Sequence, residues 1–229
     1  EASTFAAVLR SAACPKLGCS PPPGPITCSE SLMVKNGMNS KVSGKTQVFP
    51  AAVAISIGFL VLYVVLGLLG VTSQPTSAET IGDVSRWCER ISGGIFREPV
   101  NALSNLGFML AGLLMFRVLA QDPPEKQRIN RFHGITPLAT LYAATVVYLG
   151  PGSMLMHGTH TTWGRWADNL SMVMYILLPW LINVGDMGRW TPKRFFATYT
   201  SIILTYAATR WFFGTGLGIN LDLFGISIA

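Results

Sequence analysis

Charged residues are scarce in this chain of 229 residues. Asp, Glu, Lys and Arg together make up 12% of it, whereas a soluble domain carries about 25%. Histidine is also rare, with three in the whole sequence, while hydrophobic residues make up 50%. The few charges cluster between long uncharged runs, which excludes an ordinary soluble domain and makes lipid the expected solvent for much of the chain.

The net charge of +6 is spread thinly along the sequence. No basic patch is interleaved with aromatic residues, so a nucleic-acid partner is not expected. Basic loops that face anionic membrane lipids account better for the charge. The first residue is Glu1, and the hydrophobic pattern stops part-way through a segment at Ala229. Both features favour a fragment or a chain whose leader was removed.

Five long hydrophobic runs predict helices that cross a membrane, because about 20 apolar residues span its hydrocarbon core. A sixth run is too short for a full crossing. The predicted fold is an all-α integral membrane protein, a polytopic helical bundle with five full spans plus a partial sixth. The spans are residues 51–71, 101–120, 135–156, 169–184 and 195–213, and the partial span is 216–229.

Three regions divide the chain by composition. Residues 1–49 form a polar extramembrane arm that contains proline and cysteine, 50–72 an extra N-terminal transmembrane helix, and 73–229 the main bundle. Cys88 follows the first span and is therefore separated by the membrane from the three cysteines of the arm. Free thiols or a single disulfide within the arm are expected, since the cysteine spacing matches no familiar zinc pattern.

The distribution of Lys and Arg predicts the orientation. If the N-terminus lies inside (in cytosol, matrix or stroma), 12 of the 17 basic residues lie on that side, as the positive-inside rule requires. This orientation puts the loops 72–99 and 157–168 together on the outer side.

Ser153, His157 and Asp168 are the first candidates for chemistry. Ser153 and His157 are four residues apart and share a helix face if the third span continues to His157. Asp168 opens the next helix in this interpretation, and a short loop brings it back beside His157. The alternatives are an interfacial histidine and an aspartate that only caps a helix. His160 points about 60° away from His157 on a continued helix, and two histidines do not make a zinc site.

The second group of candidates begins at Trp87-Cys88-Glu89. Glu98 precedes Pro99, which is typical of a helix start. The following residues Asn101, Ser104 and Asn105 form a polar helix face that should turn toward the bundle rather than lipid. Hydrogen bonding between helices explains this face as well as a functional role does.

The chain resembles the alkaline ceramidase family in three motifs that occur in order. These are Trp-Cys-Glu, then Glu followed by Asn-x-x-Ser-Asn, and then Ser153, His157 and Asp168. That family belongs to a superfamily of membrane hydrolases that includes the adiponectin receptors, and the resemblance covers about residues 86–185. It implies a bundle of seven transmembrane helices around zinc. It also implies His157 as a zinc ligand, Ser153 as a polar group that stabilises charge, and Asp168 as an acid/base group. Zinc would activate water and polarise an amide carbonyl.

The sequence departs from this family pattern at both metal sites. The family takes two further zinc ligands from a His-x3-His on its last helix, and no histidine follows His160 here. The zinc ligand set is therefore incomplete in this sequence. The calcium-like motif comprises Trp87, Glu89 and Glu98, but Arg86 stands where calcium-binding members carry an acidic residue. Residues 1–71 lie outside the resemblance.

Two functions remain open at this point. The chain is a zinc-dependent amide hydrolase of ceramide-type lipids if the native chain continues past Ala229. Alternatively, it is a non-catalytic accessory or scaffold subunit of a larger membrane protein complex. Membrane lipids are expected partners in both cases, and other subunits in the second. A transporter or channel is disfavoured, because no inverted repeat and few intramembrane charges are present.

Overall fold

The computed structural model describes residues 47–72, 80–85, 87–121 and 131–213. Most of the predicted arm and the whole partial sixth span lie outside these residues. The described part is helical and contains no strand beyond one isolated bridge between Val84 and Arg90. Its helices are α2 (Val48–Leu68), α3 (Pro99–Ser104), α4 (Leu106–Gln121), α5 (Pro137–Thr159), α6 (Thr162–Met187) and α7 (Pro192–Phe212).

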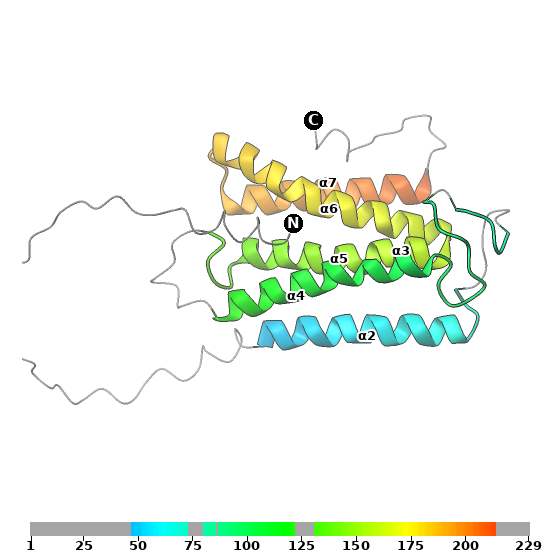
Figure 1. Ribbon diagram of the computed structural model, residues 1–229. Coiled ribbons are helices and arrows are strands. Elements are labelled where there is room, and N and C mark those ends of the chain that lie inside the picture. Colours follow the sequence, from blue (N-terminus) through cyan, green and yellow to red (C-terminus); the bar gives the residue numbers. More distant parts are fainter. Residues whose placement is uncertain (1–46, 73–79, 86, 122–130, 214–229) are drawn as a thin grey trace, which may run out of the picture. The chain divides into compact units, whose positions relative to one another are not determined.

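Helix α5 is the central helix among those described. It packs against α4 on one side and α6 on the other, while the short α3 lies against its C-terminal half (Figure 1). Helix α7 packs on α6, and α2 lies beside α4. From α4 to α7, each helix packs on the next helix in the chain, as is usual for consecutive elements.

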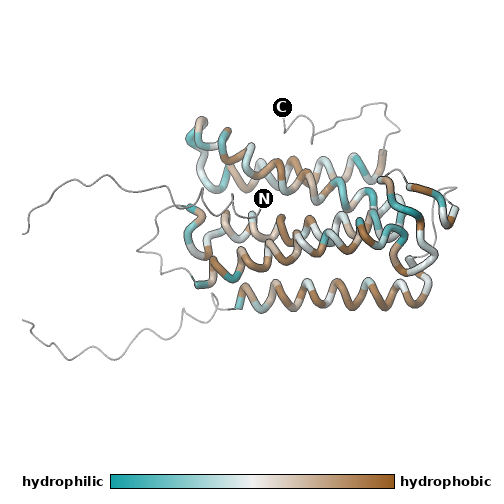
Figure 2. The backbone as a smooth tube through the Cα atoms, viewed as in Figure 1, coloured by the Kyte–Doolittle hydropathy of each residue, from teal (hydrophilic) through white to brown (hydrophobic). Residues whose placement is uncertain are grey.

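Four helical segments of the described chain are long and apolar enough to cross a membrane, which confirms a helical membrane protein. They are Val48–Leu68, Pro99–Gln121, Pro137–Thr159 and Thr162–Met187. The backbone tube is coloured hydrophobic along most of α2 (Figure 2). The prediction of five full spans was too high, since α7 forms at the predicted place but is not apolar enough. Its sequence contains several threonines as well as Lys193 and Arg194.

The connection between α5 and α6 is much shorter than the polar loop predicted at 157–168. Only His160 and Thr161 separate the two helices. His160 adopts the left-handed conformation that ends α5 (φ 53°), and the Thr161 hydroxyl accepts a hydrogen bond from the Gly164 amide to cap α6. Asp168 therefore lies inside α6 and does not open it, because Thr161 is the cap.

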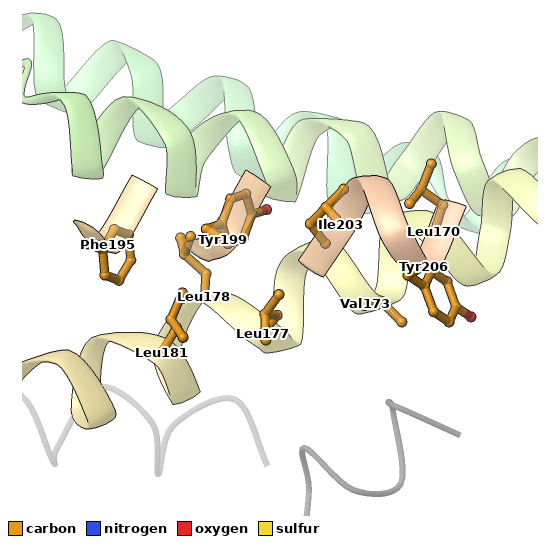
Figure 3. Close-up of a cluster of buried hydrophobic side chains, with 9 residues drawn as sticks. All are labelled: Leu170, Val173, Leu177, Leu178, Leu181, Phe195, Tyr199, Ile203 and Tyr206. Carbon is orange, nitrogen blue, oxygen red and sulfur yellow. The ribbon is translucent and has the colours of Figure 1, made fainter. Parts of the chain in front are cut away.

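Helix α7 packs on α6 through a shared apolar core. The α6 residues Leu177, Leu178 and Leu181 face Tyr199 and Ile203 of α7 (Figure 3). The Tyr199 hydroxyl also donates to the Met174 carbonyl oxygen at 3.0 Å. Tyr199 therefore adds a hydrogen bond to the apolar contacts that hold α7 on α6.

Glycine lets α5 approach α6 closely near Ser153. A Cβ at Gly152 would lie 2.5 Å from Ser171 Cβ and 2.9 Å from the Ala167 carbonyl oxygen. Small residues at such contacts are typical of membrane helix pairs. Gly107, on α4, has no atom within 4 Å of the equivalent position.

We therefore expect Gly152→Ala to lower the free energy of unfolding by about 1–3 kcal/mol, the usual cost of overpacking. Gly107→Ala is the matched control and should be neutral or slightly stabilising. Thermal unfolding of both variants in detergent measures the difference. Equal melting temperatures for the two variants would show that the α5–α6 contact tolerates a methyl group.

Helix α2 runs from one end of the bundle to the other. Near its start it packs with Phe116 and Leu119 of α4, and near its end the Tyr63 hydroxyl donates to the Ile95 carbonyl oxygen at 3.2 Å. If α2 crosses the membrane once, the chain before it and the loop around Trp87 lie on opposite faces.

Cysteine labelling tests this topology in sealed vesicles. In a cysteine-free background, an impermeant maleimide should label Arg10→Cys and Thr80→Cys from opposite sides. Met187→Cys should be labelled from the same side as Arg10→Cys, because 185–194 is predicted to share the side of the arm. Labelling of positions 10 and 80 from one side contradicts the predicted crossing.

Candidate functional site

Glu98 is the centre of a polar cluster at the C-terminal end of α5. Its side chain is fully buried, although it lies just before α3. Oε2 lies 2.5 Å from His157 Nδ1 and accepts a hydrogen bond from Asn101 Nδ2 at 3.1 Å. Oε1 faces His160 Nε2 at 3.2 Å. Two histidines and an amide thus surround one buried carboxyl group.

The surroundings of Glu98 favour its charged form. Burial by itself raises the pKa of a carboxyl group, but hydrogen bonds from the side chains of Ser85, His157 and Asn101 lower it, and so does the charge of His157. The balance leaves the pKa of Glu98 below its ordinary value. A buried carboxylate is stable only when it is paired and hydrogen-bonded in this way.

The loop before α3 is attached to the bundle at the same place. The Arg97 amide donates to the Gly158 carbonyl oxygen at 3.0 Å, and the Glu98 amide donates to the His157 carbonyl oxygen at 3.0 Å. These bonds place the last residues of this loop, Arg97 and Glu98, at the same end of the bundle as the α5–α6 connection. The Trp87 ring meets the His157 and His160 rings edge-on, with centroids 5.1 and 5.9 Å away.

Glu89 uses its carboxylate to cap α3. Its two oxygens accept hydrogen bonds from the amides of Val100 at 2.7 Å and Asn101 at 2.8 Å. The positive end of a helix dipole favours such a carboxylate. Trp87, Glu89 and Glu98, the residues of the predicted calcium-like motif, are therefore brought together around the start of α3. Both carboxylates contact protein groups there.

Ser153, His157 and Asp168 converge on the side of α5 that faces α6. The Ser153 side chain is hydrogen-bonded to the Asp168 carboxyl group, and the His157 charge acts on the same carboxyl group. Asp168 Oδ1 is buried and has no hydrogen-bond partner among the described residues. Through His157 this trio is continuous with the Glu98 cluster. Only two residues connect α5, which carries His157, to α6, which carries Asp168.

The predicted polar face of α3 is only partly turned inward. Asn105 is buried and its Nδ2 donates to the Asn101 carbonyl oxygen at 2.7 Å, whereas Asn101 itself bonds Glu98. Ser104 is exposed and its hydroxyl donates to the same Asn101 carbonyl oxygen. The expectation that all three residues face the bundle was wrong for Ser104, because α3 ends there and the helix restarts as α4.

Sequence reasoning missed two partners in the cluster. His160 was expected to point away from His157, but α5 ends at Thr159, and the left-handed conformation of His160 turns its ring toward Glu98. Ser85 contributes a side-chain hydrogen bond to Glu98 from the loop. The position of His160 directly before the Thr161 cap was the sequence signal available for His160. No sequence pattern indicated Ser85.

Fold and site define a helical membrane protein with a buried carboxylate–histidine cluster at one end of its bundle. The sequence model of the ceramidase family matches residues 84–220, which is more than half of the chain. The chain therefore belongs to the ceramidase family and is a ceramidase-like membrane protein. No curated protein and no solved structure matches it.

The zinc ion that the family resemblance implies can be tested against these residues. His157 has Nε2 left for a ligand, because Nδ1 contacts Glu98, and metal-bound histidines often have such a carboxylate partner. Asp168 Oδ1, buried without a partner, is a possible second donor. The described residues contain no group of three or more His, Cys, Asp or Glu side chains placed to hold a metal ion. A catalytic zinc needs about three protein ligands, so the described residues do not make a complete zinc site.

Proposed function

We propose that this chain serves as a scaffold or accessory subunit of a larger membrane protein complex, with its polar cluster in a structural role. The observation that carries the proposal is the environment of Glu98. This buried carboxylate contacts His157 and His160 and joins the loop before α3 to the end of α5. The contacts of Glu98 with the two histidines, together with the backbone bonds beside them, hold the loop on the bundle.

Two further observations support a role outside catalysis. The described residues offer two metal donors where a hydrolase needs about three. In addition, α2 lies before residue 84, where the family match begins, and packs mainly against α4. Its remaining surface is apolar and exposed, which suits contact with lipid or with other membrane helices.

A zinc-dependent amide hydrolase of ceramide-type lipids is the second candidate. The buried Asp168 Oδ1 favours it, because an acceptor without a donor costs free energy unless a ligand or proton occupies it. In that function Asp168 would transfer the proton, and loss of a general acid/base residue lowers turnover by about 10²–10⁴-fold. Ser153 would orient the Asp168 carboxyl group through their hydrogen bond.

Turnover of a fluorescent ceramide by the purified chain and by Asp168→Asn separates the two functions. For a scaffold we expect no release of fatty acid from either protein above a protein-free control. On native gels of mildly solubilised membranes, the tagged chain should migrate in an assembly well above its own mass. Fatty-acid release that Asp168→Asn abolishes, with the chain migrating alone, would reject the scaffold and establish the hydrolase.

A further inference from the structure

A second site lies at the opposite end of the bundle from the Glu98 cluster. An open cavity of about 670 Å³ is lined by the start of α5, the end of α6 and the start of α7. Pro137 at its edge is 20 residues before His157 on the same helix, which is about 30 Å at 1.5 Å per residue. The cavity is therefore separate from the polar cluster by about the thickness of the hydrocarbon core.

Cationic side chains predominate among the charged groups that line the cavity. Arg131 and Arg189 line it, with Asp186 as the one acidic residue of the described lining. Arg131 Nη1 lies 2.7 Å from Asp186 Oδ1, and both side chains are more than half exposed (54% and 52%). Such an exposed pair is weak, so Arg131 can turn toward an incoming anion at little cost.

The wall behind these charges is apolar and aromatic. Leu138, Ile182, Phe195 and Phe196 line it together with Trp190. The Arg194 guanidinium lies 4.6 Å from the centre of the Trp190 ring, which adds a cation beside the lining. Tryptophan at the end of a membrane helix is typical of the headgroup level. A basic rim over an apolar wall at this level matches an amphiphile with an anionic head.

Helix ends add to the positive potential. Among the described helices that line the cavity, α5 and α7 begin there, with their first residues Pro137 and Pro192 in its lining, and α6 ends there. Helix starts carry partial positive charge and helix ends partial negative charge. The volume is also within the range of about 300–1,000 Å³ that is usual for small-molecule sites.

We propose that this cavity binds one anionic phospholipid. Arg131 and Arg189 receive the headgroup phosphate, and the first part of an acyl chain lies along Leu138, Ile182 and Phe196. Basic pockets between transmembrane helices bind anionic headgroups in this manner. The site serves lipid recognition rather than chemistry, and it does not depend on which function the Glu98 cluster has.

Titration of the full chain in neutral detergent with dioctanoyl phosphatidylglycerol tests the proposal, with bound lipid counted by native mass spectrometry. We expect one tightly bound molecule. Each of Arg131→Gln and Arg189→Gln should weaken binding by about fivefold, and the double variant by roughly 25-fold, from about 1 kcal/mol per basic residue. Arg165→Gln is the matched control, since this exposed arginine lies near the start of α6, at the other end.

Asp186→Asn gives the sharpest result. It breaks the pair with Arg131 and removes the acidic residue of the lining. Because a negative charge beside the phosphate is lost, the substitution should strengthen lipid binding by about fivefold. If the Arg131–Asp186 pair has only a structural role, lipid binding should not become stronger. The proposal fails if Asp186→Asn weakens binding, or if Arg165→Gln weakens it as much as the cavity variants do. It also fails if dioctanoyl phosphatidylcholine, or glycerol phosphate without chains, binds as tightly.

Discussion

Replacing Glu98 by alanine should lower the free energy of unfolding by about 2–6 kcal/mol, because His157 and Asn101 each lose a hydrogen bond and a buried polar group left unpaired costs about 1–3 kcal/mol. The variant leaves His157 and His160 without their shared carboxylate and releases the contact between the loop and α5. Chemical unfolding in detergent measures the change. Asp83→Ala, which removes an exposed carboxylate from the same loop, should cost less than about 1 kcal/mol.

The pH dependence of this stability has a definite sign. Because the pKa of Glu98 is lower in the folded chain than its ordinary value, its contribution is present above the ordinary pKa of a glutamate. It is lost as the pH falls through the lowered value. Glu98→Gln should therefore flatten the acid side of the stability curve. An unchanged acid limb in Glu98→Gln, or a loss in Glu98→Ala no larger than in Asp83→Ala, would contradict a structural role for the cluster.

Asp168→Asn should have the opposite effect on stability. The Asp168 Oδ1 atom is a buried acceptor without a hydrogen-bond partner among the described residues, and such an atom costs about 1–3 kcal/mol, more if it is charged. Removing the charge should raise the free energy of unfolding, because a buried amide costs less to desolvate than a buried carboxylate, while the asparagine can still bond Ser153. Asp83→Asn controls for the loss of one negative charge.

The direction of this change tests whether Asp168 has a purely structural role. Functional sites commonly retain costly groups that a neutral substitute relieves. A loss of stability in Asp168→Asn would show that the carboxylate is needed for packing. A gain in stability without any effect on ceramide turnover agrees with a chain in which Ser153, His157 and Asp168 have no catalytic role.

The sequence was sufficient for the helices and for the convergence of the trio. Hydrophobic runs placed α2, α4, α5 and most of α6, because an uncharged run of span length has few alternatives to a membrane helix. The spacing of Ser153 and His157 on one helix face, together with a short connection, correctly brought Asp168 near them. Charge counts predicted one membrane side for the loop 72–99 and the α5–α6 connection, and Arg97 and Glu98 of that loop do bond to the end of α5.

Local helix ends could not be predicted as well. The polar stretch around Thr161 was interpreted as a loop, whereas a single Thr cap and a left-handed His160 allow two helices to meet almost directly. As a result, Asp168 lies inside α6 and His160 faces Glu98, neither of which was predicted. Helix α7 was counted as a span because its length is sufficient, but its threonines and its two basic residues near the start reduce its hydropathy.

Metal analysis of the purified chain, residues 1–229, is the most direct test of the central claim that the cluster has a structural role. With His157 and Asp168 as two donors, affinity should be weak, and we expect well under one zinc per molecule after purification without chelators. The melting temperature should not change when EDTA is added. One zinc per molecule that EDTA removes, together with release of fatty acid from ceramide, would contradict the structural role and establish the chain as a zinc hydrolase.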